Sequence, residues 1–170
     1  MENQNLKFDF VFLGQSVLKY QVPLDIFTTI NQIYEQNFHN LAPANGQLVG
    51  KIENEHSLFY HGKDQTKMKN HNMLPTNVTD YLMTVFKHYL AFNKIKDYDT
   101  HLNSIWVNEM KQHEYNPAHI HRGMLFTGLS SVMILKLPST YGKEYSADHI
   151  PQNGRLQILG ASNGQFAKID

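Results

Sequence analysis

The hydrophobic and polar positions of this chain change their period several times, and each change marks a predicted element. Residues 7–13 and 16–22 are short β-prone runs on either side of Gly14, a pattern typical of a hairpin or a bent strand. From Leu24 the apolar residues recur at helical spacing as far as Phe38. We therefore expect two strands and then a helix with one buried stripe.

The next part of the chain predicts a loop, two short runs and a further loop. Residues 40–46 have the Pro, Gly and Asn content of a loop. The runs 48–52 and 56–60 follow and suit either strands or a short helix. Residues 61–74 are polar and contain few apolar side chains, so we expect an exposed loop there.

A second helix is predicted after this loop. Thr76 or Asn77 can cap it, and an unbroken apolar stripe runs from Val78 to Leu90. The helix is expected to end near Asn93.

Strand periodicity dominates the second half. Residues 104–110 alternate, with Ile105 and Val107 on one face and Trp106, Asn108 and Met110 on the other. An apolar strand is expected over 129–137 and another over 155–159. Helices with accessory strands come first and a run of strands follows, which favours an α+β protein whose second half is a sandwich or barrel.

Length and composition narrow the class of protein. At 170 residues the chain suits a single domain, with an apolar content of 41% and 10 glycines, as in soluble globular proteins. Fifteen basic and fifteen acidic side chains cancel, so nothing favours generic binding of nucleic acid. The sequence opens without a secretory pattern and contains no run of about 18 apolar residues, so we expect a cytoplasmic protein with no membrane span.

Metal chemistry, if present, must use nitrogen and oxygen ligands, because the chain has no cysteine and ten histidines. His119 and His121 form the sharpest local motif. On a strand, residues i and i+2 project from the same face about 6–7 Å apart, so two imidazoles can grip one ion. Imidazole suits Fe, Zn, Ni and Cu. A pair of loop histidines bonded to backbone or water remains the alternative.

The surroundings of the pair resemble a known family. The segment 105–138 contains a W-x-N strand, then N-P-x-H-x-H-x-G, then an apolar strand ending in Lys-x-Pro, and residues 48–55 (LVGKIENE) supply an upstream element with a glycine and a glutamate. Together these motifs, over roughly residues 45–140, resemble the 2-oxoglutarate/Fe(II)-dependent oxygenases of T4-like phages of marine bacteria and of bacteria, which are prolyl-hydroxylase-like.

The resemblance implies a double-stranded β-helix, or jelly roll, preceded by N-terminal helices. Residues 1–100 would form the helical and accessory part, and 101–170 the core strands. It also implies Fe(II) and 2-oxoglutarate as cofactors, with His119 as the first metal ligand and His121 where the family has a carboxylate. The family's distal segment, Phe-Pro-x-x-x-x-His followed by a basic residue, is not identifiable, so the jelly roll is expected either to lack its C-terminal strands or to obtain them from another chain. His149 is the remaining candidate for a third ligand.

Four further residues are candidates for binding the co-substrate. Asn108 lies near the metal in the resemblance, Arg122 can clamp a carboxylate bidentately, and Tyr115 and Ser131 can donate hydrogen bonds to one. The expected substrate is a small molecule or a protein, in a bacterial or phage-infected cytoplasm, and a homo-oligomer is compatible with the sequence.

Two other functions stay open. A non-catalytic β-sandwich, such as a virion or interaction component derived from the same scaffold, would explain the missing distal histidine and arginine. A cupin-like protein could instead hold a metal with three histidines and without 2-oxoglutarate.

Overall fold

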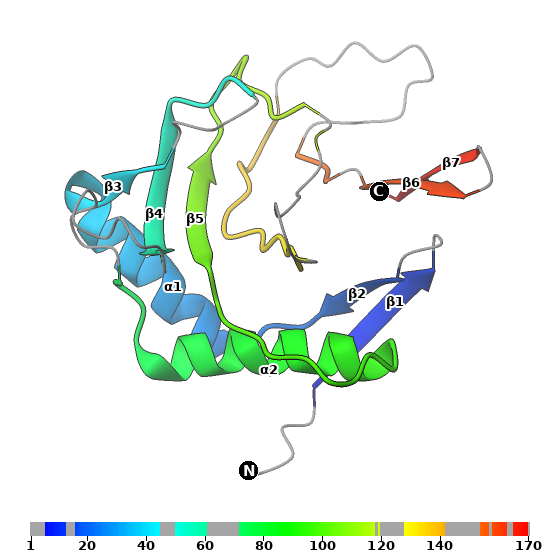
Figure 1. The fold of residues 1–170 in the computed structure, drawn as a ribbon. Helices are drawn as coiled ribbons and strands as arrows, with labels where there is room; N and C mark the ends of the chain where they lie inside the picture. The colour runs from blue at the N-terminus through cyan, green and yellow to red at the C-terminus, as the bar shows by residue number, and fades with distance from the viewer. Residues whose placement is uncertain are drawn as a thin grey trace. The chain divides into compact units, whose positions relative to one another are not determined.

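The computed structural model describes residues 6–12, 16–44, 50–60, 72–117, 119, 128–141, 154–156, 158–162 and 165–169. Contacts divide the chain into two compact units, one formed by 1–7 with 20–129 and the other by 8–19 with 130–170. The described residues form two α-helices and three small antiparallel sheets, so the predicted α+β class is confirmed (Figure 1).

Both predicted helices are present in the first unit. Helix α1 spans Leu24–Asn37, is followed by the short 3-10 turn η1 (Phe38–Asn40), and buries Ile26 and Ile30, one helical turn apart. Helix α2 spans Thr76–Phe92 and packs against α1. The predicted cap of α2 was wrong: Pro75 occupies the N-cap position, and the helix begins without a side-chain capping hydrogen bond.

Helix α2 ends in a Schellman motif built without glycine. The N–H of Lys94 donates to the carbonyl of Ala91, and the N–H of Ile95 donates to the carbonyl of Leu90, both at 3.0 Å. This turn requires a left-handed residue, and Lys94 adopts it with φ 57°. Because a β-carbon is disfavoured there, the end of the helix is strained.

The sheet of the first unit has the order β3–β4–β5, with β3 at Ala42–Pro43, β4 at Asn54–Tyr60 and β5 at Ser104–Glu109. All pairs are antiparallel, and β4 pairs with β5 from Asn54 opposite Glu109 to Tyr60 opposite Ser104. The predicted strand 104–110 is therefore confirmed, and residues 56–60 form a strand and not a helix. A register shift between Ser57 and Phe59 places Leu58, which is fully buried, at a bulge.

The second unit contains two hairpins. Strand β1 (Phe8–Phe12) pairs with β2 (Ser16–Tyr20), whose last residue already belongs to the first unit, and β6 (Ile158–Ser162) pairs antiparallel with β7 (Gln165–Ile169). The N-terminal hairpin confirms the prediction for residues 7–22. A strand was predicted over 155–159, whereas the observed strand β6 begins three residues later, because its pairing with β7 starts at Ile158.

The apolar segment 129–137 differs from the prediction, because none of it belongs to a described strand. Side chains such as Val132 (62% exposed) and Ile134 (49% exposed) lie at the surface. An apolar run becomes a strand only where a neighbouring edge offers hydrogen-bond partners, and composition by itself does not supply one.

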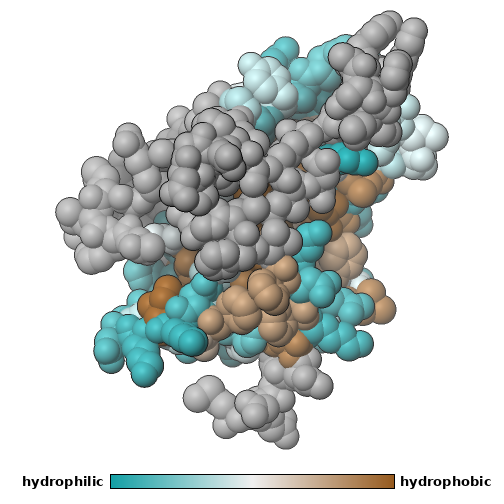
Figure 2. Space-filling model, turned by 90° about the vertical axis from the view of Figure 1, so that its right-hand side faces the viewer, coloured by the Kyte–Doolittle hydropathy of each residue, from teal (hydrophilic) through white to brown (hydrophobic). Residues whose placement is uncertain are grey.

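Apolar and hydrophilic residues both reach the face of the molecule shown in Figure 2. In the first unit, the exposed apolar side chains include Phe92, Ile95 and Tyr98 at and after the end of α2. No helix in the described part of the chain is long and apolar enough to cross a membrane.

The left-handed residue at the end of α2 gives a test of the fold. Lys94→Gly removes the β-carbon that strains this turn, so we expect the free energy of unfolding to rise by about 0.5–1 kcal/mol in chemical denaturation. Lys96→Gly, two residues on at a position without positive φ, is the control and should lower stability slightly by loosening the unfolded chain. Equal effects of the two changes would contradict the strained turn.

Candidate functional site

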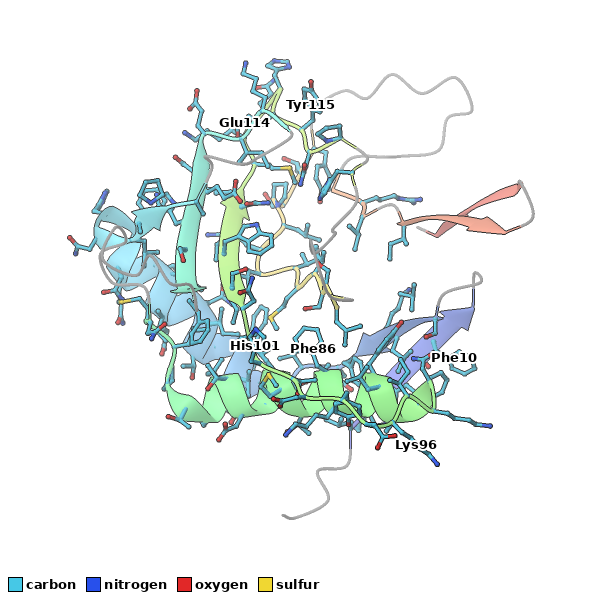
Figure 3. The ribbon with its side chains drawn as sticks, in the orientation of Figure 1. Phe10, Phe86, Lys96, His101, Glu114 and Tyr115 are labelled. Carbon is cyan, nitrogen blue, oxygen red and sulfur yellow. The ribbon has the colours of Figure 1, made fainter. Side chains whose placement is uncertain are left out.

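The pairing of β4 with β5 brings together the two sequence elements that carry the predicted function. Beyond the ladder the contact continues as an isolated bridge, in which Lys51 and Tyr115 exchange backbone hydrogen bonds of 3.0 and 3.2 Å. The upstream element 48–55 and the start of the histidine motif are therefore neighbours. Figure 3 shows Glu114 and Tyr115 at this end of the strands, with Phe86 and His101 at the α2 end.

Gly50 permits this close approach. A β-carbon at position 50 would overlap the carbonyl oxygen of Tyr115 and would lie 2.8 Å from the Cα of Asn116. Both are backbone atoms, which cannot move aside as the end of a flexible side chain can. The glycine of the upstream element is thus explained by the backbone that precedes His119.

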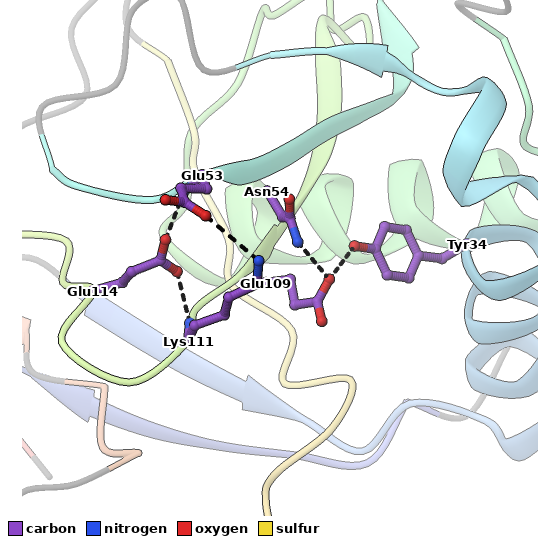
Figure 4. Close-up of polar contacts among 6 residues, drawn as sticks. All are labelled: Tyr34, Glu53, Asn54, Glu109, Lys111 and Glu114. Atoms are coloured by element: carbon purple, nitrogen blue, oxygen red, sulfur yellow. Dashed lines mark hydrogen bonds and ion pairs between the residues drawn. The ribbon is translucent and has the colours of Figure 1, made fainter.

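Glu114 stabilises the loop between β5 and the His119 motif by accepting two backbone hydrogen bonds. One carboxylate oxygen accepts the backbone N–H of Glu53 at 2.9 Å, and the other accepts the backbone N–H of Lys111 at 2.7 Å (Figure 4). These two bonds, that of Lys111 first, lower the pKa of Glu114 below its ordinary value. The side chains of Lys111 and Glu53 add an exposed ion pair of 3.5 Å, which contributes little by itself.

His119 is exposed, and its Nδ1 lies 2.8 Å from the carbonyl oxygen of Pro117. Because a carbonyl can only accept, Nδ1 carries the proton in this bond, and the lone pair of the neutral ring belongs to Nε2. Metal-binding histidines commonly donate their other N–H to a backbone carbonyl in this way. The tautomer of His119 therefore fits a metal ligand, although the same bond is also compatible with a loop histidine.

The other predicted site residues are distributed over the chain. Tyr115 is 59% exposed on the same loop as His119, and Ser131 is exposed in the second unit. His121, Arg122 and His149 lie outside the described residues, so the pairing of His119 with His121 stays a prediction. Among the residues that are described, no group of three His, Asp or Glu side chains could hold a metal ion.

Asn108 lies on β5 directly opposite Glu55 of β4. Glu55 is only 5% exposed, and its Oε2 and the Oδ1 of Asn108 are both buried without a hydrogen-bond partner. Burial raises the pKa of the Glu55 carboxyl above its ordinary value. An anionic co-substrate beside Asn108 would therefore lie close to the buried carboxyl group of Glu55.

The opposite face of the same ladder packs against α1 and η1. The ring of His56 lies 4.6 Å from that of Phe38 and 6.3 Å from that of Tyr34, measured between centroids. Burial lowers the pKa of His56, an effect that the carboxylate of Glu109 opposes. Tyr34 donates a 3.3 Å hydrogen bond to Glu109 (Figure 4), and burial, with the charge of Glu109, raises the pKa of this phenol to about 12.

Glu55 was identified from the sequence only as the glutamate that ends the upstream element 48–55, and no function was assigned to it. A signal was available, because strand alternation puts Glu55 and Ser57 on one face and Trp106 and Asn108 on one face of the partner strand. The sequence does not reveal the register of β4 and β5, which places Glu55 directly opposite Asn108.

Comparison with known proteins adds no further assignment: no family model, no curated protein and no solved structure matches this chain.

The close approach at Gly50 is testable by a small substitution. Gly50→Ala should lower the free energy of unfolding by about 1–3 kcal/mol, because the added methyl group forces two backbone segments apart. Gly128→Ala is the matched control, since a β-carbon there meets nothing within 4 Å. Denaturant titration of both variants is the measurement, and equal stability of the two would contradict the contact.

The buried carboxyl of Glu55 predicts a specific pH dependence. Its folded pKa lies above its ordinary value of 4.5, so the stability from its protonation is present below that pH and is lost as the pH rises through the folded pKa. Glu55→Gln removes this loss. We therefore expect the free energy of unfolding of the variant to rise relative to that of the wild type as the pH increases above 4.5, by about 1–3 kcal/mol at neutral pH, in parallel denaturation curves. A difference that does not change with pH would contradict the prediction.

Proposed function

We propose that this chain is a 2-oxoglutarate/Fe(II)-dependent oxygenase of the jelly-roll class that acts on a substrate not yet identified. The proposal rests on the motif W-x-N, N-P-x-H-x-H-x-G and Lys-x-Pro at residues 106–138. Its principal structural support is that the upstream element with Gly50 and the loop before His119 are held together by backbone bonds.

The metal would be held by His119 and His121, with His149 as the third ligand. An all-nitrogen set suits Fe(II), and the proton on Nδ1 of His119 leaves the ring in the tautomer that such a ligand needs. When bound, the iron supplies oxidative chemistry in which 2-oxoglutarate is decarboxylated and a C–H bond of the substrate is hydroxylated.

The residues of this chain would bind and orient the co-substrate. Arg122 offers a bidentate cation for a carboxylate, and Tyr115 and Ser131 offer hydroxyl donors. The Pro117 carbonyl orients the ring of His119, and Glu114 holds the loop that carries it. Asn108, beside a buried carboxyl, is less suited to an anion than these groups are.

A non-catalytic interaction protein is the second candidate. It is favoured by the exposed apolar side chains of the segment 129–137, where Leu129, Val132, Ile134 and Leu137 are between 37% and 62% exposed. Apolar groups gathered in this way often mark a surface that contacts another protein.

The decisive experiment is an anaerobic titration of the chain with Fe(II) and 2-oxoglutarate. We expect a metal-to-ligand charge-transfer absorption band that saturates with added iron, and we expect His119→Ala to abolish it or weaken iron binding by about 10- to 100-fold. His39→Ala, which changes a histidine of η1 away from the motif, should leave the band intact. A wild-type chain without the band would exclude the oxygenase and favour the interaction protein.

A further inference from the structure

One face of the β4–β5 ladder carries two buried oxygen atoms that receive no hydrogen bond from the described residues. Glu55 is 5% exposed and Ser57 3% exposed, and both point to this face because they are two residues apart on one strand. Asn108 is directly opposite Glu55, and side chains so placed have Cβ atoms about 4.5–5.5 Å apart. The Oε2 of Glu55 and the Oδ1 of Asn108 are both buried without a partner.

Ser57 and Asn108 carry an O–H and N–H donors, but in the described part of the chain no donor reaches the Oε2 of Glu55 or the Oδ1 of Asn108. The Oε2 of Glu55 is buried and accepts no hydrogen bond from the residues that the structure describes. A buried carboxylate is costly unless a cation or donors compensate it, and the amide oxygen of Asn108 can only accept. A ligand that suits these two oxygens would bring a positive charge and N–H donors to them.

A primary ammonium group fits these requirements better than a metal ion. It has three N–H donors, which match the three acceptors provided by Glu55, Ser57 and Asn108, and its single charge balances one carboxylate. A divalent cation would leave a net positive charge, and Ca²⁺ takes six to eight oxygen ligands where this face offers three side chains.

Trp106 adds a place for the carbon chain of such a ligand. It is directly opposite Ser57 on the same face, and 38% of its surface is exposed, while the two unpartnered oxygens are themselves shielded from solvent. An indole ring packs against methylene groups and attracts a nearby cation through its π-electrons.

We propose that Glu55, Ser57 and Asn108 form a binding site for a primary alkylammonium group, with Trp106 lining the approach. The ligand class is an amine-bearing molecule, either a free aliphatic amine or the side chain of a lysine. If this ligand is also the molecule that is hydroxylated, which rests on the oxygenase function proposed above, the enzyme acts on an amine-bearing substrate.

The test uses the whole chain without added metal, so that its result is independent of iron binding. Calorimetric titrations with n-butylamine and with Nα-acetyl-lysine methylamide measure affinity, and the fluorescence of Trp106, the only tryptophan, reports the location. We expect saturable binding of both amines with a change in fluorescence. Tighter binding of the lysine derivative identifies a lysine side chain as the natural ligand, and equal binding identifies a free amine.

Two variants and two neutral analogues decide the outcome. Glu55→Gln should weaken amine binding by about 10- to 100-fold, because it removes the charged acceptor. Glu109→Gln, a carboxylate on the opposite face of the same ladder, should leave the affinity unchanged. n-Butanol and the Nε-acetylated lysine derivative should not bind measurably.

The proposal is overturned if the neutral analogues bind as tightly as the amines, if Glu55→Gln has no effect, or if Ca²⁺ or Mg²⁺ saturates the site and the amines do not. Ser57→Ala and Asn108→Leu are two further single variants, each of which removes one acceptor. If both bind the amines as tightly as the wild type does, the site is also overturned. An absent charge-transfer band with intact amine binding would refute only the oxygenase.

Discussion

The antiparallel pairing of residues 54–60 with 104–109 is the interaction on which the candidate site depends. It joins segments about 50 residues apart, and its hydrogen bonds set which side chains share a face. The same pairing continues to the bridge of Lys51 with Tyr115, where two backbones approach so closely that only glycine fits at position 50. A shift of the register by one residue would separate Glu55 from Asn108 and turn both to other neighbours.

The two faces of this ladder have different chemistry. On one face, Tyr34, Phe38 and His56 form a cluster of rings, and Tyr34 and Asn54 both donate to the carboxylate of Glu109. That face is packed and Glu109 accepts two hydrogen bonds there, but the buried Nδ1 of His56 has no hydrogen-bond partner. On the other face, buried oxygens of Glu55 and Asn108 lack donors. Polar groups are seldom left so in a folded protein without a reason, and a ligand that brings donors is one such reason.

His119, the described residue of the proposed metal site, follows the same end of the ladder that carries Glu55 and Asn108. Glu114 holds the loop after β5 by two backbone N–H groups, and this loop leads through Tyr115 and Pro117 to His119. A metal held by His119 and an amine held beside Glu55 would then be positioned by neighbouring parts of one scaffold. The two proposals remain separable, because the first concerns imidazole nitrogens and the second concerns a carboxyl, an amide and a hydroxyl.

The sequence by itself determined the elements whose pattern is local. The apolar stripes of α1 and α2, the hairpin near residues 8–20 and the alternation of 104–109 all follow from side-chain periodicity, and the structure confirms them. The family motif also belongs to the sequence, since it consists of residue types at fixed spacing. The cap of α2 was missed because Pro75 can occupy the N-cap position without a side-chain bond, which no periodicity reveals.

The tertiary structure decided everything that depends on partners distant in the chain. Whether residues 56–60 form a strand, whether 129–137 joins a sheet, and which residue is opposite Asn108 all depend on hydrogen bonds between segments far apart in sequence. The burial of Glu55 also depends on the tertiary structure. The sequence shows that residue 55 carries a carboxyl group, but only the neighbouring side chains determine how far that group is removed from water.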